Sequence, residues 1–373
     1  MKKSFLLLLI LTISILAEEF TANKVCKACH PLIYKEYVSS MHFKSTIFRD
    51  KIHRKIFSIH PLSKKERYQC AKCHTPTDKE LLNKCESSQK AMPKSDSKGQ
   101  QEAISCSYCH RIKDIKEHAK MNQNIINDKK RYFYADDKNI EGVKEYSIKK
   151  GVFVSRSGSP YHTIDTTNEL FKNGKVCLGC HSHKRNQKDF LICKTEFEDS
   201  SKENCITCHM PKVGGSFVNH IDTKIHRYHG FSGVFNTPEF LSKYIELSIK
   251  KDKFLTIKIK NRAPHNIFLH PMRVAALKVT ITNKGKKIAE FEKRFLKIYG
   301  KNGKKAPLWE ATEILKDTTL KAKESKNVTF EYIPKEKDVI KVEFGFYIIN
   351  PVLAKKLDLK EFSDFKVLRT VIF

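Results

Sequence analysis

The chain has 373 residues and a formal net charge of +30, from 71 Lys and Arg residues against 41 Asp and Glu residues. A charge of this sign favours acidic partners, anionic substrates or anionic lipid surfaces, although a general richness in lysine would produce it as well. Beyond the N-terminus no segment is apolar enough to span a bilayer, so we expect no transmembrane anchor.

The N-terminus has the pattern of a secretory signal. Met1-Lys2-Lys3 is followed by an apolar run from Phe5 to Leu16 and then by Ala17. This run is shorter than the roughly 20 residues that a spanning helix needs, and a basic start, a short apolar core and a small residue are typical of a signal peptide. We therefore predict that residues 1–17 are a signal peptide cleaved after Ala17, and that the mature protein is exported, which places it in the periplasm.

A C-x-x-C-H pattern recurs five times and accounts for ten of the twelve cysteines. The two thiols of such a motif can add to the two vinyl groups of one haem, and the next residue offers an imidazole to the iron. The motifs are Cys26/Cys29/His30, Cys70/Cys73/His74, Cys106/Cys109/His110, Cys177/Cys180/His181 and Cys205/Cys208/His209. They predict five covalently attached haems c. Zinc sites or a disulfide framework would leave the repeated histidine unexplained. Nucleic acid is not an expected partner of an exported haem protein.

Residues 18–230 contain all five motifs and few long periodic segments, which predicts a pentahaem domain of short helices and loops. Short helices are expected at 31–40 and near 77–85, an exposed loop at 92–101, and a solvated, lysine-rich excursion at 119–150. Such a domain needs little peptide core, because the porphyrins supply apolar surface to be buried.

The composition changes near Gly230, after which cysteine is absent and strand patterns begin. Apolar and polar residues alternate from Leu255 onward, as in a half-buried strand. Further apolar-rich runs lie at 274–281, 288–298, 328–333, 339–349 and 367–373. Turn signals at Asn283–Gly285 and Gly300–Gly303 separate some of them. We therefore predict a β-rich domain over 231–373 that resembles an antiparallel β-sandwich, with Trp309 in a packing role.

Each iron needs a second axial ligand or keeps an open face. Two imidazoles favour electron transfer, whereas an open face permits substrate chemistry. Eleven histidines lie outside the five motifs and are the available ligands.

The first motif, followed by His42 in Ser-Ser-Met-His-Phe-Lys-Ser, resembles the first haem segment of cytochrome c-554, the tetrahaem acceptor of hydroxylamine oxidoreductase. This resemblance implies that His42, His118 and either His226 or His229 are axial ligands. Ser-Pro-Tyr-His162 before the fourth motif, and the Asn-Cys-Ile-Thr-Cys-His-Met-Pro segment of the fifth, resemble the wider group of cytochromes related to hydroxylamine oxidoreductase. That group implies a ligand at His162 and, in the β domain, at His265, where Pro264 replaces the group's Gly.

Two functions of different classes are compatible with these patterns. An electron carrier would pass electrons between redox partners, among which the positive charge favours acidic ones, through largely bis-His haems. A reductase would act on nitrite, hydroxylamine or nitric oxide at one open haem, although all five motifs end in His where pentahaem nitrite reductases use Lys at the catalytic haem. A third possibility is a docking subunit whose β domain binds a redox partner. Cys85 and Cys193 are left over, and they could form a disulfide in an oxidising compartment or remain free thiols.

Overall fold

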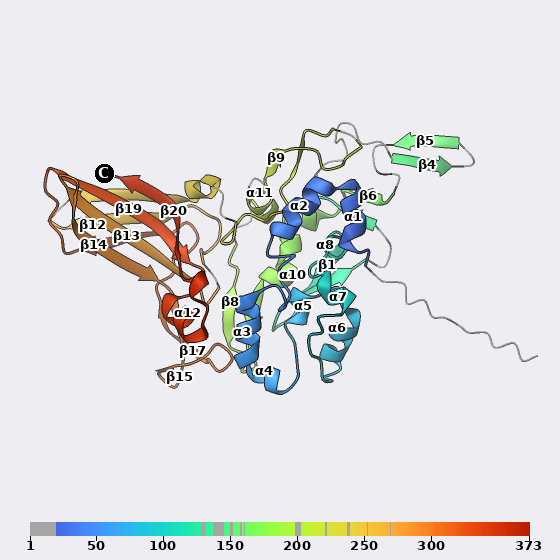
Figure 1. Cartoon of the computed structure of the whole chain (residues 1–373), viewed down its shortest axis with the longest axis horizontal. Helices are drawn as coiled ribbons and strands as arrows, with labels where there is room; N and C mark the ends of the chain where they lie inside the picture. The colour runs from blue at the N-terminus through green and yellow to red at the C-terminus, as the bar shows by residue number, and fades with distance from the viewer. Residues whose placement is uncertain are drawn as a thin grey trace, which may run out of the picture.

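The computed structural model describes residues 20–127, 131–136, 145–149, 152–156, 159, 161–197, 203–220, 222–236, 239–251, 253–268 and 270–373. The predicted signal peptide lies outside these residues. Figure 1 shows short helices and hairpins at one end of the molecule and long strands at the other.

The cysteine-containing part is built on short helices. They are α1 (Asn23–Cys29), α2 (Pro31–Ser39), α3 (Lys51–Ile59), α4 (Pro61–Lys64), α5 (Ala71–His74), α6 (Lys79–Glu86), α7 (Lys98–Gln101), α8 (Cys106–Cys109), α9 (Glu169–Lys172), η1 (Lys175–Cys177), α10 (Leu178–His181) and α11 (Cys205–His209). Asp50 and Asp78 begin α3 and α6 because each side chain accepts hydrogen bonds from free amides of the first turn. Helices α2 and α6 lie where the sequence predicts them, and α7 occupies the end of the predicted loop at 92–101.

Short strand pairs fill the rest of this part. They are β1 (Ile112–Lys116) with β2 (Gln123–Ile126), β3 (Arg131–Phe133) with β6 (Thr163–Asp165), β4 (Glu145–Lys149) with β5 (Val152–Arg156), β7 (His183–Arg185) with β8 (Leu191–Lys194), and β9 (Lys212–Gly214) with β10 (Ile225–Arg227). The segment predicted as a solvated excursion therefore contains strands. One of its residues, Phe133, is buried in a small core with Phe20, Tyr108 and Phe171, which explains why this segment is not simply exposed.

The C-terminal part forms three antiparallel sheets. Their strands, in sheet order, are β11 (Ile245–Lys251), β12 (Leu255–Asn261) and β18 (Ser325–Phe330); β14 (Lys286–Phe295), β13 (Val274–Asn283), β19 (Asp338–Tyr347) and β20 (Phe365–Ile372); and β16 (Lys304–Lys305), β15 (Lys297–Lys301) and β17 (Glu313–Asp317). Helix η2 (Glu239–Tyr244) precedes them, and α12 (Pro351–Leu357) and η3 (Lys360–Phe362) interrupt the last connection.

Alternation along the strands builds one apolar core between the two larger sheets. Leu255, Ile257 and Ile259 are fully buried on β12, and Leu277 and Val279 face them from β13. At the turn between β13 and β14, Lys284 and Gly285 both have positive φ, as the favoured two-residue hairpin turn requires. The predicted run at 288–298 is two strands, because the amide of Leu296 donates to the Thr318 hydroxyl.

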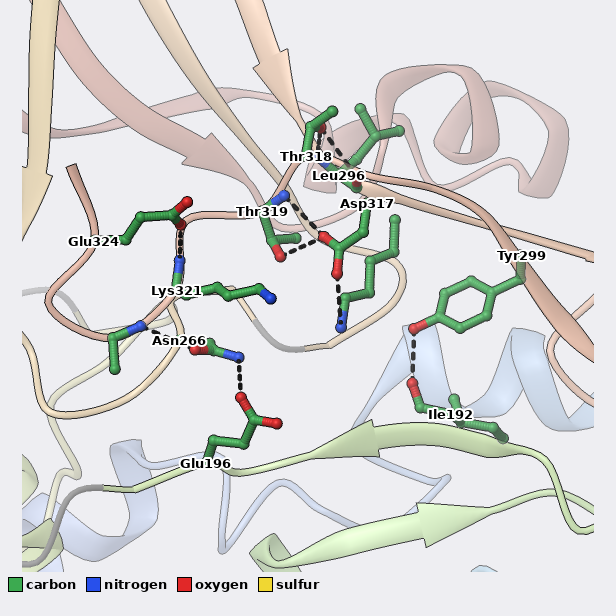
Figure 2. Close-up of polar contacts among 12 residues, drawn as sticks. Ile192, Glu196, Asn266, Leu296, Tyr299, Asp317, Thr318, Thr319, Lys321 and Glu324 are labelled. Atoms are coloured by element: carbon green, nitrogen blue, oxygen red, sulfur yellow. Dashed lines mark hydrogen bonds and ion pairs between the residues drawn. The ribbon is translucent and has the colours of Figure 1, made fainter. Parts of the chain in front are cut away.

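Side-chain contacts fasten the β part to the cysteine-containing part. Tyr299 Oη donates to the carbonyl of Ile192 at 2.7 Å, and the Asn266 amide donates to Glu196 at 3.3 Å (Figure 2). An isolated bridge pairs Phe197 with His265. Strand β15 and the loop that contains His265 and Asn266 are thereby held against β8 and the residues that follow it.

Candidate haem sites

Each C-x-x-C-H motif lies on or beside one turn of helix. The motifs fall at the end of α1, at α5, at α8, at η1 and α10, and at α11. Residues three and four apart share one face of a helix, so a single turn directs both thiols and the following imidazole to the same side. In α11, Asn204 and Thr207 form a capping box that fixes this turn.

Backbone carbonyls orient four of the motif histidines. A carbonyl oxygen can only accept, so the Nδ1 atom facing it carries the proton and Nε2 keeps its lone pair for a metal. The Nδ1 atoms lie 2.5 Å from Phe217 O for His30, 3.0 Å from Ser45 O for His74, 2.8 Å from Phe133 O for His110, and 2.6 Å from Ser232 O for His209. These four imidazoles are in the tautomer that a ligand through Nε2 needs.

Four motif histidines face a second histidine at nearly the same separation. The ring centres are 6.2 Å apart for His30 and His162, 6.2 Å for His42 and His181, 6.3 Å for His110 and His229, and 6.1 Å for His209 and His265. A histidine nitrogen binds a metal at about 2 Å and the ring centre lies roughly 1 Å behind it, so two rings on opposite sides of one iron are about 6 Å apart. The four pairs fit this requirement.

The second histidines of these pairs are suited to the same role. His229 Nδ1 donates to Arg227 O at 2.6 Å and His265 Nδ1 donates to Asn266 O at 2.8 Å, which leaves Nε2 free in both. Burial lowers the pKa of His42 and of His229 to about 3, and it also lowers the pKa of His162 and of His265. The rings are therefore neutral near pH 7, and the neutral imidazole is the form that binds iron.

The surroundings of His74 differ from those of the other motif histidines. The ring of His53 lies only 4.0 Å from that of His74, too close for an iron between them. Sequence reasoning did not single out His53, which is one of eleven histidines outside the motifs and lies in the amphipathic helix α3. It is buried, and its pKa is lowered to about 4 by that burial.

His226 and His118 have other surroundings. His226 Nδ1 donates to Gly215 O at 2.9 Å, and Nε2 lies 2.9 Å from the Glu36 carboxylate, so both ring nitrogens are engaged. His118 is exposed in the loop between β1 and β2, where its carbonyl lies 3.0 Å from Nε2 of His183. The structure thus brings His229, and not its rival His226, to a motif histidine.

Thiols of different motifs lie close enough to shift one another's pKa. This holds for Cys26 and Cys106, for Cys73 and Cys180, and for Cys177 and Cys205. Haems attached at these thiols would be near neighbours. The contacts relate the first motif to the third, the second to the fourth, and the fourth to the fifth.

At Cys208 the structure adds a contact that the sequence does not predict. The motif pattern gives Cys208 a role in haem attachment, whereas in the structure its Sγ lies 3.3 Å from the hydroxyl of Tyr244, in η2. That hydroxyl also lies 3.3 Å from the Glu203 carboxylate, and burial, the thiol and the carboxylate together raise the pKa of Tyr244. A thioether sulfur can still accept a hydrogen bond weakly, so this contact is compatible with the predicted attachment of haem at Cys208.

Cys85 and Cys193 are not bonded to each other in the structure. Cys85 Sγ donates to Tyr68 O at 3.3 Å within a small core, whereas Cys193 lies on β8, paired with Lys184 of β7. Of the two alternatives from the sequence, the structure has the free thiols.

Among the helices of the described residues, none is both long and apolar enough to cross a membrane. The described side chains also contain no cluster of three or more His, Cys, Asp or Glu residues arranged to hold a bare metal ion. Paired histidines beside paired thiols are instead the donor set of haem c.

Comparison with known proteins supports the same cofactor. Residues 25–111 match the family described as cytochrome c554 and c-prime. A crystal structure of a penta-heme cytochrome c552 from Thermochromatium tepidum has a similar fold, with a TM-score of 0.67 and 21% sequence identity over 95% of this chain and 99% of that chain. A search of curated proteins found no match. Residues 25–111 are thus similar to the cytochrome c554 and c-prime family, and the chain shares the fold of a penta-heme cytochrome. Both findings agree with the five attachment motifs and support covalently bound haem c as the cofactor.

Proposed function

We propose that the protein is an exported pentahaem electron carrier in which at least four haems have two histidine ligands. The four histidine pairs at 6.1–6.3 Å are the observation that carries this proposal. Two imidazoles close both faces of an iron and favour electron transfer over substrate binding. The proposed ligands are His30 with His162, His181 with His42, His110 with His229, and His209 with His265, and His74 for the remaining haem.

The thiol contacts support a continuous path for electrons. They relate motif one to motif three and join motifs two and five to motif four. The pKa of Cys180 is also raised in part by the nearby Cys109, so motif three approaches motif four. The proposed path therefore runs from the first haem through the third to the fourth, where it branches.

In this proposal the chain is organised as a signal peptide (1–17), a pentahaem domain (18–230) and a β-sandwich domain (231–373), and it works in the periplasm. The β domain completes the fifth haem by supplying His265. Redox proteins are the proposed partners, and the charge of +30 favours acidic ones.

Electron paramagnetic resonance of the oxidised protein tests the carrier role. Irons with two histidine ligands give low-spin signals, so we expect at least four low-spin haems of five. Two or more high-spin haems would contradict the proposal.

A second candidate function depends on the haem of the second motif. The ring of His53 is too close to His74 to share an iron with it. His270 acts on the pKa of His74 but does not form a ring pair with it like the four pairs above, so an open face at this one haem is the alternative. Steady turnover of nitrite or hydroxylamine, together with one high-spin signal that these ligands change, would favour a reductase.

A further inference from the structure

Two histidines share one carbonyl oxygen beside the second motif. Nδ1 of His53 and Nδ1 of His74 each lie 3.0 Å from the carbonyl oxygen of Ser45. The two rings are 4.0 Å apart and tilted by 44°. Ser45 is itself held in place, because its hydroxyl donates to the carbonyl of His74 at 2.6 Å.

The protonation of both rings follows from this contact. A carbonyl cannot donate, so both Nδ1 atoms carry the proton. Nε2 of His53 is then an acceptor, and the hydroxyl of Tyr68 lies 3.3 Å from it. Tyr68 is fully buried and stacks on His53 at 5.6 Å and 21°. His53 therefore donates to Ser45 from a fixed position.

Sharing the acceptor affects the ligand strength of His74. A hydrogen bond donated by the distant nitrogen of a metal-bound histidine makes the ring a stronger electron donor to the metal. A carbonyl that already accepts one strong hydrogen bond is a weaker acceptor for the second. The bond from His74 is therefore weaker than it would be if Ser45 accepted from His74 alone.

We propose that His53 is a positioning residue for the second haem, which packs against the His74 ring and weakens its bond to Ser45, and so keeps the reduction potential of that one haem high. The inference rests on the proposed ligation by His74. It concerns no other haem, because His53 contacts only this motif histidine among the rings of the described residues.

The test replaces His53 in the full-length holoprotein. His53→Phe keeps an aromatic ring against His74 but donates nothing to Ser45, whereas His53→Asn is the matched control, because its side-chain amide can occupy the place of Nδ1. Reduction potentials of the five haems are resolved by redox titration monitored by optical and electron paramagnetic resonance spectra. We expect His53→Phe to lower the potential of one haem and leave the other four unchanged, and His53→Asn to restore the wild-type value.

Three outcomes would overturn the proposal: no shift in His53→Phe, a raised potential, or the same shift in His53→Asn. If His53→Phe does not mature, Tyr68→Phe gives a second reading. Loss of the Tyr68 hydroxyl weakens the hydrogen bond from His53 to Ser45, because the two bonds belong to one chain. We therefore expect Tyr68→Phe to lower the reduction potential of the second haem by less than His53→Phe does. An unchanged or raised potential would contradict the proposal. Failure of the proposed electron-carrier function can be told apart from failure of the His53 proposal. The first appears in the wild type as fewer than five haems or as several high-spin irons, whereas the second appears in the variants.

Discussion

Asn186 holds the connection that carries Trp309 against the haem-binding part, and its removal should release that connection. Its amide donates to the carbonyls of Leu308 and Ala311 at 2.9 and 2.8 Å, and its Oδ1 accepts from the amides of Lys188 and Phe190 at 2.9 and 3.1 Å. The residue is only 7% exposed. Asn186→Ala therefore leaves four polar groups without a partner.

The expected cost follows from this count. Only the two bonds to Leu308 and Ala311 reach the connection, because Lys188 and Phe190 belong to the same turn as Asn186. Each of the two contributes about 1 kcal/mol net, so together they give about 2 kcal/mol. A loss of about 2 kcal/mol makes the detached connection roughly thirtyfold more populated. Tyr299→Phe is a matched control at the same interface, because it removes one hydrogen bond, the 2.7 Å contact to Ile192, and should cost about 1 kcal/mol.

Trp309 reports the change directly. It is the one tryptophan of the chain, and its ring lies 5.0 Å from that of His60. Haem absorbs the light that tryptophan emits, so Trp309 should be dim while the connection is docked and bright after release. In guanidinium titrations followed by this fluorescence, Asn186→Ala should shift the midpoint below that of Tyr299→Phe. Equal midpoints for the two variants would refute the reasoning.

Four further outcomes are expected. A pyridine haemochrome assay should give five haems per chain, and three or fewer in a matured sample would contradict the motif interpretation. His229→Leu should create one high-spin iron. His226→Leu should leave the spin states unchanged, because both ring nitrogens of His226 are engaged by Glu36 and Gly215; the reverse result would make His226 the axial ligand. Alkylation of the denatured, unreduced protein should label Cys85 and Cys193, and protection of both would show a disulfide. A fragment of residues 230–373 should be folded and β-rich by circular dichroism, because its main core is self-contained; an unfolded fragment would show that docking is needed.

Sequence patterns predict the local features of this protein and not its long-range contacts. The alternation in β12 and the turn at Gly285 follow from chemistry within a few residues, and the structure has both. His226 and His229 lie three residues apart, and the local sequence does not distinguish them as ligands. What separates them is Glu36, about 190 positions away, which occupies Nε2 of His226, and no local pattern contains this information.

The same reason explains why His53 had no signal in the sequence. Its role depends on the carbonyl of Ser45 and on the hydroxyl of Tyr68, which are brought to it by two different segments. Every residue has a backbone carbonyl, so the sequence does not indicate which carbonyl accepts a hydrogen bond from a histidine. His118 shows the converse, because its spacing after the third motif resembles that of a ligand, yet it lies on the surface beside His183.

The proposed ligand pairs join parts of the chain that are far apart, and this has a consequence for folding. His30 and His162 enclose most of the cysteine-containing part, and His209 and His265 span its junction with the β strands. Each pair closed on one iron restricts the unfolded chain as a cross-link does, and longer loops are restricted more. The small, separate apolar cores of the cysteine-containing part can therefore be enough to stabilise its fold. His265 lies in a loop held by Asn261, whose amide donates to the His265 carbonyl at 3.0 Å. If His265 is the second ligand of the fifth iron, as proposed, this ligand reaches the iron once the β part has docked against the cysteine-containing part.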